Sequence, residues 1–372
     1  MMWRGSFRFR GRNKEEMNKL RFAAVGTGFW ARYQLAGWRE LSDVQCVALC
    51  NLNRGRAEEL AREFGVPAVY DDPQEMLERE TLDFLDIITD VKTHAPLVCL
   101  AAERRLPVIC QKPMAPTLAE AVEMVRVCRE SSTPFYVHEN WRWQTPLRQL
   151  KHDLLSGVIG RPFRARIHFC SSFPVFDNQP FLKELEQFIL TDIGSHILDA
   201  ARFLFGEAST LYCRTHRIHK EIKGEDVATV MMTMGSGTTV VCEMSYASRI
   251  EHERFPETYV VIEGEKGSLE LGPDYRICTT TDAGSCARRY PPPRYSWVDP
   301  AYELVQASIV PCNANLLAAL RGESPAETTG EDNLRTVQLI FAAYESARSG
   351  RVISLSAEGL EAREHIFRGL LP

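Results

Sequence analysis

Three side chains in this chain could perform acid–base chemistry together: Lys112, Asp192 and His196. Lys112 directly follows an apolar run that ends in Gln111, so we expect it at the carboxyl end of a strand. Asp192 and His196 are four residues apart, which places both on one face of a helix that begins near Asp192. An acid that orients an imidazole is the usual arrangement of a general base, and a desolvated lysine of lowered pKa can bind a developing alkoxide. The same residues could instead be a solvent-reaching lysine, an N-cap aspartate and a core histidine.

A glycine turn near the start of the chain predicts a dinucleotide site. The strand-like run of residues 20–25 ends in Gly26-Thr27-Gly28, and a helical pattern follows. Gly26 can supply the tight turn, and Gly28 lets the backbone approach a pyrophosphate held by the first N–H groups of the helix. A glycine turn of this kind also serves packing alone, so the prediction depends on the rest of the chain.

Short apolar runs alternate with helical patterns from residue 20 to about residue 139, which predicts a parallel sheet wound by crossover helices. We expect one helix to begin at Thr93, a natural N-cap, and another near Thr117. Open sheets of this kind bind ligands at the carboxyl ends of their strands, where Lys112 would lie. The six predicted strands are residues 20–25, 44–50, 68–70, 84–89, 107–111 and 134–139.

The second predicted strand ends at Asn51, where an acid normally binds the adenosine ribose of the cofactor. An asparagine can still hydrogen-bond a hydroxyl, and it carries no charge to repel a 2′-phosphate. Arg54 and Arg56 follow closely, and they are equally well interpreted as the solvated first turn of a helix. We therefore expect NAD as the cofactor and do not exclude NADP.

The sequence after Arg142 consists mainly of short strands joined by glycine-containing turns, which predicts a largely antiparallel sheet. Helical patterns at about residues 192–205 and 330–349 interrupt and close it. The basic segment that precedes the first strand lacks the apolar core of a signal peptide, and Met17 is a candidate start of the protein.

Composition excludes several classes of protein. The 372 residues carry a net charge of -5, which argues against nucleic acid as the main partner, and no apolar run approaches membrane-spanning length. The eleven cysteines are odd in number and form no C-x-x-C pair, which favours free thiols in a cytoplasmic protein. Cys278 and Cys286 flank a predicted hairpin and could pair if oxidised. No metal is expected because no H-E-x-x-H or comparable spacing occurs among the candidate ligands His94, His138, Glu139, Asp192, His196 and Asp199.

Several segments, taken in order from about residue 20 to residue 355, resemble the Gfo/Idh/MocA family of sugar and inositol oxidoreductases. The resemblance is carried by GTGFWA (26–31), Thr89 with THA (93–95), QKPMAPT (111–117), HENWRW (138–143), DIGSH (192–196) with Asp199, TGEDNLRT (329–336) and ESARSGR (345–351). The first of these segments is the glycine turn, and the third and fifth contain Lys112, Asp192 and His196. Three positions depart from the family pattern: Gln111 replaces the usual glutamate, Asn51 replaces the ribose-binding acid, and Asp90 stands where proline is frequent.

The resemblance implies an α/β fold with two domains. A Rossmann dinucleotide-binding domain would occupy residues 20–141, and residues 142–372 would form an α/β domain for substrate binding and oligomerisation, with a large open and mostly antiparallel sheet. Residues 1–19 would be a disordered or docking arm. The expected partners are a small carbohydrate or polyol and further copies of the chain, with no nucleic acid and no membrane.

The sheet positions and the resemblance together define the expected site. The resemblance implies that Lys112 works with Asp192 and His196 in catalysis. Substrate contacts are expected from Lys112, Trp141, Phe176, Asp192 and His196, with Phe173, Asp177 and Asn178 in the same loop as Phe176 and with Trp143 as an alternative to Trp141. Simple interdomain packing would explain the two tryptophans equally well. Cofactor contacts are expected from Gly26, Thr27, Gly28, Phe29, Trp30, Asn51, Arg56, Thr89, His94, Gln111, Lys112, Asn140 and Arg142.

The expected reaction transfers a hydride between the nicotinamide and a ring secondary alcohol of a sugar, glycoside or inositol, with the C3 hydroxyl as one candidate. His196 would accept the hydroxyl proton while Asp192 stabilises the imidazolium and Lys112 binds the oxygen; alternatively, Lys112 is the base. Two other interpretations stay open. One is an NAD-dependent hydrolase that oxidises a glycoside transiently to allow elimination, and the other is a non-catalytic protein that senses nicotinamide.

Overall fold

The six apolar runs of the N-terminal half form one parallel sheet in the computed structural model, which describes residues 19–251 and 255–355. The strand order, β3-β2-β1-β4-β5-β6, places the glycine turn after β1 at the point where the order reverses. Three of the strands are one or two residues shorter than predicted. The bounds are β1 (Leu20–Val25), β2 (Val44–Cys50), β3 (Ala68–Tyr70), β4 (Phe84–Ile87), β5 (Val108–Gln111) and β6 (Phe135–His138).

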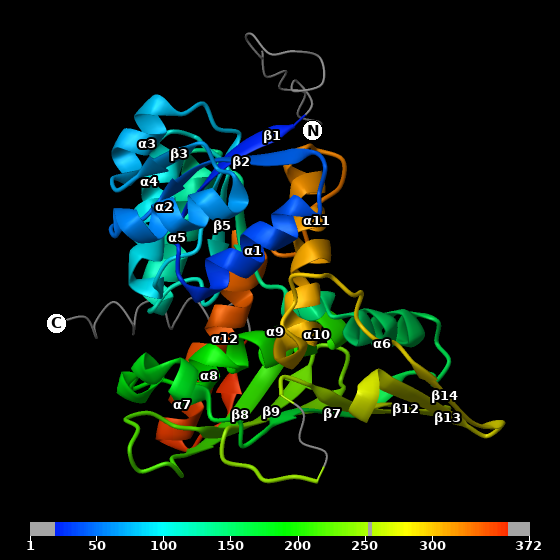
Figure 1. The fold of residues 1–372 in the computed structure, drawn as a ribbon. Helices are drawn as coiled ribbons and strands as arrows, with labels where there is room; N and C mark the ends of the chain where they lie inside the picture. The colour runs from blue at the N-terminus through cyan, green and yellow to red at the C-terminus, as the bar shows by residue number, and fades with distance from the viewer. Residues whose placement is uncertain (1–18, 252–254, 356–372) are drawn as a thin grey trace.

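Crossover helices cover both faces of this sheet, with α1 and α2 on one face and α4 and α5 on the other (Figure 1). The predicted N-cap at Thr117 is confirmed, because its hydroxyl accepts a hydrogen bond from the backbone N–H of Glu120. The helix predicted to begin at Thr93 is confirmed, with Thr93 at the N-cap position of α4. Its hydroxyl makes no capping bond, however, and instead bonds Thr89 and the carbonyl of Asp90 within a short 3-10 turn that precedes α4. The helices are α1 (Phe29–Arg39), α2 (Arg54–Phe64), α3 (Pro73–Arg79), α4 (His94–Glu103) and α5 (Leu118–Glu130), with the 3-10 turn η2 (Val91–Thr93).

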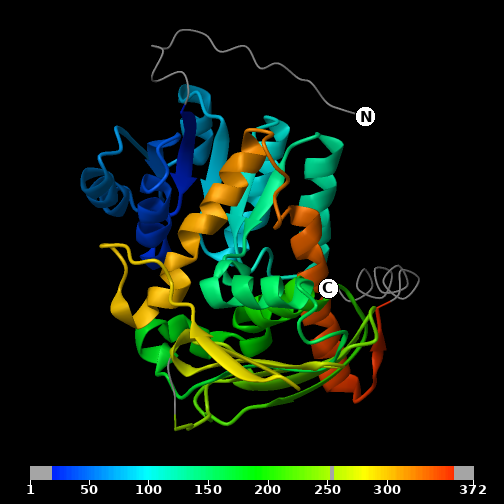
Figure 2. The ribbon, with the colours of Figure 1, turned by 90° about the vertical axis from the view of Figure 1, so that its right-hand side faces the viewer.

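The second half forms a nine-stranded sheet in the order β14-β13-β12-β11-β7-β10-β9-β8-β15, antiparallel except for β7 beside β10. Buried and exposed residues alternate along its central strand β9, so the sheet has one covered and one open face. The helices α6, α8, α9 and α12 lie over the covered face (Figures 1 and 2). The strands are β7 (Pro162–Cys170), β8 (Ala208–His216), β9 (Val227–Met234), β10 (Thr239–Ser245), β11 (Tyr259–Gly264), β12 (Gly267–Gly272), β13 (Arg276–Thr281), β14 (Gly284–Arg289) and β15 (Ile353–Ser354).

The helices of the second half connect the two sheets. α11 packs on α1 and α12 packs on both α5 and α9, so these two helices return the chain to the first sheet (Figure 2). The predicted helix at 330–349 is confirmed as α12, and the one predicted at about 192–205 is confirmed as α9, although α9 begins at Gly194 and Asp192 ends the preceding helix α8. The predicted domain boundary at 141–142 stays a prediction. The helices are α6 (Thr145–Leu155), α7 (Val175–Asn178), α8 (Ile189–Asp192), α9 (Gly194–Phe205), α10 (Glu303–Ala307), α11 (Ile309–Leu320) and α12 (Gly330–Ser349), with 3-10 turns η3 (Trp141–Trp143), η4 (Pro180–Glu184), η5 (Pro273–Tyr275) and η6 (Pro300–Tyr302).

The register of β13 and β14 rules out the disulfide considered from the sequence. Cys278 lies opposite Ala287, and Cys286 lies opposite Thr279. Successive side chains of a strand point to opposite faces, so the two thiols lie on opposite faces of the hairpin, and both are free. In the ranges that the structure describes, no helix has the length and apolar character needed to cross a membrane. The predicted N-terminal arm, with Met17, lies almost entirely outside those ranges.

Candidate active site

The glycine turn lies at the edge where the strands of the first sheet end. Gly26 has a φ of +104°, and a Cβ there would lie 2.3 Å from the carbonyl oxygen of Ile88. Only glycine fits this turn without moving the chain that follows β4. Gly28 precedes α1 with an ordinary φ of -76°, and a Cβ on it would meet nothing within 4 Å. The fold therefore requires glycine at position 26, whereas the space above Gly28 is open.

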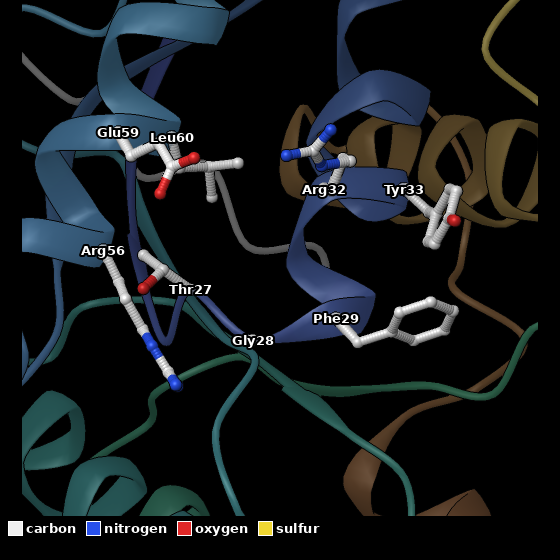
Figure 3. Close-up of a pocket in the computed structure, with 8 residues that line it drawn as sticks. All are labelled: Thr27, Gly28, Phe29, Arg32, Tyr33, Arg56, Glu59 and Leu60. Carbon is white, nitrogen blue, oxygen red and sulfur yellow. The ribbon is translucent and has the colours of Figure 1, made fainter. Parts of the chain in front are cut away.

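A hollow of about 430 Å³ opens beside Gly28, between the first turns of α1 and α2 (Figure 3). Two polar atoms, Thr27 Oγ1 in the lining of this hollow and Trp30 Nε1 in the first turn of α1, are buried without a hydrogen-bond partner among the described residues. Buried polar atoms are normally paired, so these atoms and the open helix N-terminus suit a ligand rich in phosphate and hydroxyl oxygens. The residues present fit NAD. The hollow is lined by Thr27, Gly28, Phe29, Arg32, Tyr33, Arg56, Glu59 and Leu60.

The polar residues after β2 have different environments. The amide of Asn51 donates to the carbonyl of Asn53 at 3.0 Å, and Arg54 forms an exposed ion pair with Glu58 at 3.0 Å. Arg54 therefore belongs to the surface of α2, as its alternative interpretation had it. Arg56 extends along the hollow beside Thr27 and makes no ion pair with any described residue (Figure 3). Its contact with the cofactor stays a prediction.

Lys112 and Asp192 meet between the two sheets. Lys112 Nζ lies 3.1 Å from Asp192 Oδ1 and 3.3 Å from the backbone oxygen of the same residue. The other carboxylate oxygen accepts a hydrogen bond from the hydroxyl of Tyr246, at 3.3 Å. Because Lys112 follows β5 and Asp192 ends α8, the fold joins two groups that are 80 residues apart in the sequence. About one fifth of each side chain, 21% and 22%, is exposed, so a ligand can reach the pair.

His196 has a partner that the sequence did not indicate. Its Nδ1 lies 2.7 Å from Glu139 Oε1, and its ring stacks on Trp141 with centroids 4.2 Å apart. Asp192, which we expected to orient this imidazole, ends α8 while His196 lies in the first turn of α9. Asp192 therefore acts on His196 through its charge, and Glu139 is the residue that accepts the hydrogen bond of the imidazole. An Nδ1–H that donates to Glu139 leaves Nε2 as the proton-accepting nitrogen.

Burial shifts the pKa values of this pair in opposite directions. Burial lowers the pKa of His196 well below 6.5; the charge of Lys112 lowers it further, while Asp192 raises it. Burial raises the pKa of Glu139 to about 7. The hydrogen bond from the backbone N–H of Trp141 and the positive charges of Lys112 and Arg142 oppose this rise. Near neutral pH the imidazole is therefore uncharged and able to accept a proton.

Several predicted cofactor residues are engaged by the protein itself. The ring of His94 lies within 3.2 Å of the carbonyl oxygens of Thr89, Pro113 and Met114, and burial lowers its pKa. This ring joins the ends of β4 and β5, which also fixes the backbone just after Lys112.

Asn140 and Arg142 are buried in contacts that tie the C-terminal helices to the end of β6. The amide of Asn140 donates to Val305 and Ser308 at 2.9 and 2.8 Å. Arg142 binds Asp199 at 2.5 and 2.8 Å and Asp332 at 2.9 Å. Both residues therefore fix the end of β6 against the C-terminal helices, and their contacts with the cofactor stay predictions.

The aromatic residues expected at the substrate lie at different depths. Trp141 forms the floor under His196 and donates its Nε1–H to Thr258 at 2.9 Å. Trp143 packs under the guanidinium of Arg148, 4.3 Å from its ring. Phe176 lies 5.5 Å from Phe188 between ring centroids, and Phe188 in turn stacks on Tyr246.

The loop before α7 has further contacts. Phe173 stacks on Phe255 with centroids 3.9 Å apart. Asp177 is exposed, and the side chain of Asn178 lies outside what the structure describes. Their contact with a substrate stays a prediction.

Two functional residues were missed in the sequence. Glu139 follows β6 within the HENWRW segment, directly before Asn140. In the sequence it was considered only as a possible metal ligand. Its place at the carboxyl end of a strand was the signal that could have identified it. Tyr246 follows β10 and carried no comparable signal. Over the described residues, no group of three or more histidine, cysteine, aspartate or glutamate side chains is arranged to hold a metal.

A parallel sheet with a ligand-ready glycine turn, a neutral imidazole and a lysine–aspartate pair at the same edge defines an NAD-binding oxidoreductase of two domains. Comparison with known families agrees. Residues 20–139 match the oxidoreductase family with an NAD-binding Rossmann fold, and residues 147–270 match the Gfo/Idh/MocA C-terminal domain. The chain belongs to the Gfo/Idh/MocA family and is an NAD-dependent dehydrogenase that acts on CH–OH groups.

Similar proteins span nearly the whole chain. The D-apiose dehydrogenase of Paraburkholderia graminis is 42% identical over 93% of this chain and 92% of its own length. That of Rhizobium rhizogenes is 39% identical over 92% of this chain and 99% of its own length. An oxidoreductase from Agrobacterium radiobacter, solved with NAD+, L-tartaric acid and magnesium, superimposes with a TM-score of 0.88 at 39% identity, covering 90% of this chain and 98% of that one.

Proposed function

We propose that this protein oxidises D-apiose, or a small sugar close to it, with NAD as the hydride acceptor. The main support is the similarity to the two D-apiose dehydrogenases, at 42% and 39% identity over more than nine tenths of the chain. By contrast, the D-glucoside 3-dehydrogenase of Escherichia coli is 30% identical over only 54% of the chain, so glucosides are the weaker candidates.

We assign the proton transfer to His196. Its Nδ1 is held by Glu139, so Nε2 can accept the proton of the substrate hydroxyl as the oxygen becomes a carbonyl. Lys112 donates a hydrogen bond to that same oxygen and stabilises the charge that develops on it, while Asp192 and Tyr246 hold the lysine in place. NAD, when bound, supplies the electrophilic carbon that takes the hydride. The alternative role of Lys112 as the base fits less well, since Lys112 is paired with Asp192 in an ion pair.

Thr27, Gly28, Trp30 and Arg56 would hold the cofactor. The turn offers N–H groups to the pyrophosphate, and the buried Oγ1 of Thr27 and Nε1 of Trp30 offer hydrogen bonds that no described residue satisfies. Asn51 would bind the adenosine ribose through the oxygen of its amide, because its nitrogen already donates to Asn53.

The proposed substrate constrains the carbon that is oxidised. D-Apiose is branched at C3, which bears no hydrogen, so a hydride cannot leave from that carbon. The C3 hydroxyl considered from the sequence therefore applies only to substrates such as glucosides or inositols. For D-apiose we propose the anomeric carbon, whose oxidation gives a lactone.

The experiment that tests this function combines the purified protein and NAD with D-apiose, a methyl glucoside and myo-inositol in separate reactions. The appearance of reduced nicotinamide and the product mass are followed together. We expect reduction with D-apiose and a product that has lost two hydrogens. Reduction with the glucoside alone would refute the proposed substrate, and cleavage of the glucoside without net reduction would support the hydrolase.

We also propose that copies of the chain associate through the open face of the nine-stranded sheet. This face carries Met231, which is 48% exposed in the middle of β9, and ion pairs between Arg164 and Glu263 and between Arg166 and Glu243 that lie across neighbouring strands. A broad sheet face that no helix covers offers the area that an interface between copies needs. Light scattering tests this proposal, and a Met231→Lys variant should shift the mass toward the monomer. We also propose a cytoplasmic location, because all eleven cysteines are free thiols, as a reducing compartment would keep them.

A further inference from the structure

A row of buried polar side chains crosses the first sheet just behind Lys112. It begins at Asp86 in β4, which is fully buried, and continues through Gln34 of α1 to Gln111 at the end of β5. Gln34 Nε2 lies 2.8 and 2.9 Å from the two oxygens of Asp86, and Gln111 Nε2 lies 2.5 Å from Gln34 Oε1. The interior of such a sheet is normally apolar, so three linked polar groups there call for an explanation.

The hydrogen bonds of this row all run in one direction. Asp86 also accepts a bond from Trp38 Nε1 at 2.8 Å, so every neighbour of its carboxylate is a donor. Gln34 must therefore turn its NH₂ group toward Asp86 and its oxygen toward position 111. Position 111 must then supply a donor, which a glutamine has and an ionised glutamate lacks.

Gln111 connects this network to the backbone of Lys112. Its oxygen accepts the backbone N–H of Lys112 at 3.1 Å, and its NH₂ group also reaches His138 Nδ1 at 3.1 Å. His138 then donates from Nε2 to Asn313 Oδ1, at 2.9 Å. Burial lowers the pKa of His138 to about 4, in keeping with a neutral ring that accepts at Nδ1.

We propose that Asp86 and Gln111 are a matched pair of positioning residues: the buried carboxylate orients Gln34, Gln34 requires a donor at position 111, and the resulting network holds the backbone of Lys112 in register with the helix that follows the glycine turn. The pair explains why glutamine stands at position 111, because a second buried carboxylate would face the oxygen of Gln34. The positioning role toward Lys112 rests on the proposed function, whereas the coupling of Asp86 to Gln111 does not.

The network can run in the opposite direction only if both ends change. With asparagine at position 86, Gln34 can flip, accept from the new NH₂ group and donate to a glutamate at position 111. His138 can then protonate Nδ1 and accept from Asn313 Nδ2, which lacks a partner among the described residues. The Asp86→Asn change should therefore rescue Gln111→Glu. Alone, Gln111→Glu turns a carboxylate toward the oxygen of Gln34, and Asp86→Asn turns an NH₂ group toward a neighbouring N–H donor.

The test compares wild type, Q111E, D86N and D86N/Q111E at about pH 8, above the value of about 7 to which burial raises the pKa of Asp86. Turnover of D-apiose, NAD affinity and the midpoint of thermal unfolding are measured for each. We expect Q111E to lower kcat about tenfold or more with a lower unfolding midpoint, in line with buried unsatisfied groups. The double variant should recover to within about threefold of wild type, since its groups pair again.

The matched control is D83N/Q111E. Asp83 precedes β4 and accepts the backbone N–H of Arg21 at 2.7 Å, outside the network, so its loss of charge should rescue nothing. Wild-type behaviour of Q111E, a double variant no better than Q111E, or equal rescue by D83N would each overturn the proposal. If Q111E fails to fold, an active and folded D86N/Q111E still supports it. If the wild type does not oxidise D-apiose, the proposed function fails, while NAD affinity and unfolding still report the coupling.

Discussion

The two ends of the carboxyl edge of the first sheet differ in how their polar groups are held. At the glycine turn, Thr27 Oγ1 and Trp30 Nε1 are buried without partners among the described residues, and the space above Gly28 is open. At the other end, Lys112 is held by Asp192, and His196 is held by Glu139. We propose that the first end is completed by its ligand, whereas the side chains of the second are already held in place by the protein itself.

This difference separates binding from chemistry, and variants should show it. Changes at the preorganised end should lower kcat with little effect on NAD affinity, whereas changes at the open end should do the reverse. Four predictions follow this division from the largest expected effect to the smallest.

Replacing His196 should have the largest effect. The His196→Ala variant removes the group that accepts the substrate proton, and we expect kcat to fall by about 10²- to 10⁴-fold. NAD affinity, measured by calorimetry, should stay within about threefold of wild type, because the change lies at the catalytic end. His152→Ala, on α6, is the matched control and should keep full activity. A variant of His196 with near-normal kcat would remove the proposed base.

The next effect should come from Lys112, through the oxygen that it is proposed to bind. Lys112→Met keeps the length of the side chain and removes its hydrogen bond to the developing charge, so kcat should fall about 10²- to 10³-fold. Lys112→Arg keeps a donor and the pairing with Asp192, and should retain more activity than the methionine variant. Equal loss in both variants would mean that the lysine acts as a base and not as a hydrogen-bond donor.

The pH dependence of kcat/KM should report the protonation of Glu139. Its pKa is raised to about 7 by burial, so acidification protonates it near neutral pH. A protonated Glu139 donates to Nδ1 of His196, which shifts the imidazole proton to Nε2 and removes the base. We therefore expect kcat/KM to fall as the pH drops through about 7, with the apparent pKa belonging to the Glu139–His196 pair. Glu139→Gln should lower the activity and flatten this limb; an unchanged acid limb in that variant would contradict the assignment.

The glycines should give the smallest effects, and they should separate by type. Gly28→Ala places a methyl group where the pyrophosphate is expected, so NAD affinity should fall about tenfold while the protein stays folded. Gly26→Ala meets the carbonyl of Ile88 and a φ of +104°, so it should lower the free energy of unfolding by about 1–3 kcal/mol or more. Thermal unfolding and NAD titration of both variants are the measurements. Equal loss of stability in both would show that the space above Gly28 serves packing.

Much of the scaffold could be predicted from local pattern. The period of the apolar residues located all six strands of the first sheet within two residues, and Thr117 was recognised as a cap because capping depends on neighbours in the chain. Gly26, Gly28 and Lys112 could be placed at one edge of a sheet for the same reason. A strand-to-helix turn and a strand end are both local features, and parallel strands bring their ends together.

Local pattern failed where the partner of a side chain comes from a distant element. The four-residue spacing of Asp192 and His196 suggested one helix face, but the helix divides at Ile193 and each side chain pairs with the first sheet instead. The partners of Arg142 likewise come from distant elements, Asp199 in α9 and Asp332 in α12, while its contact with the cofactor stays a prediction.

The types of the reacting groups and their positions at strand ends are therefore written in the sequence, because backbone periodicity and turn chemistry act over a few residues. The pairing of Lys112 with Asp192 and of His196 with Glu139 is not, because hydrogen bonds between elements 80 and 57 residues apart depend on how two sheets pack. The direction of the hydrogen bonds from Asp86 to Gln111 likewise depends on the tertiary structure. A buried carboxylate orders its neighbours only after the fold has excluded water from around it.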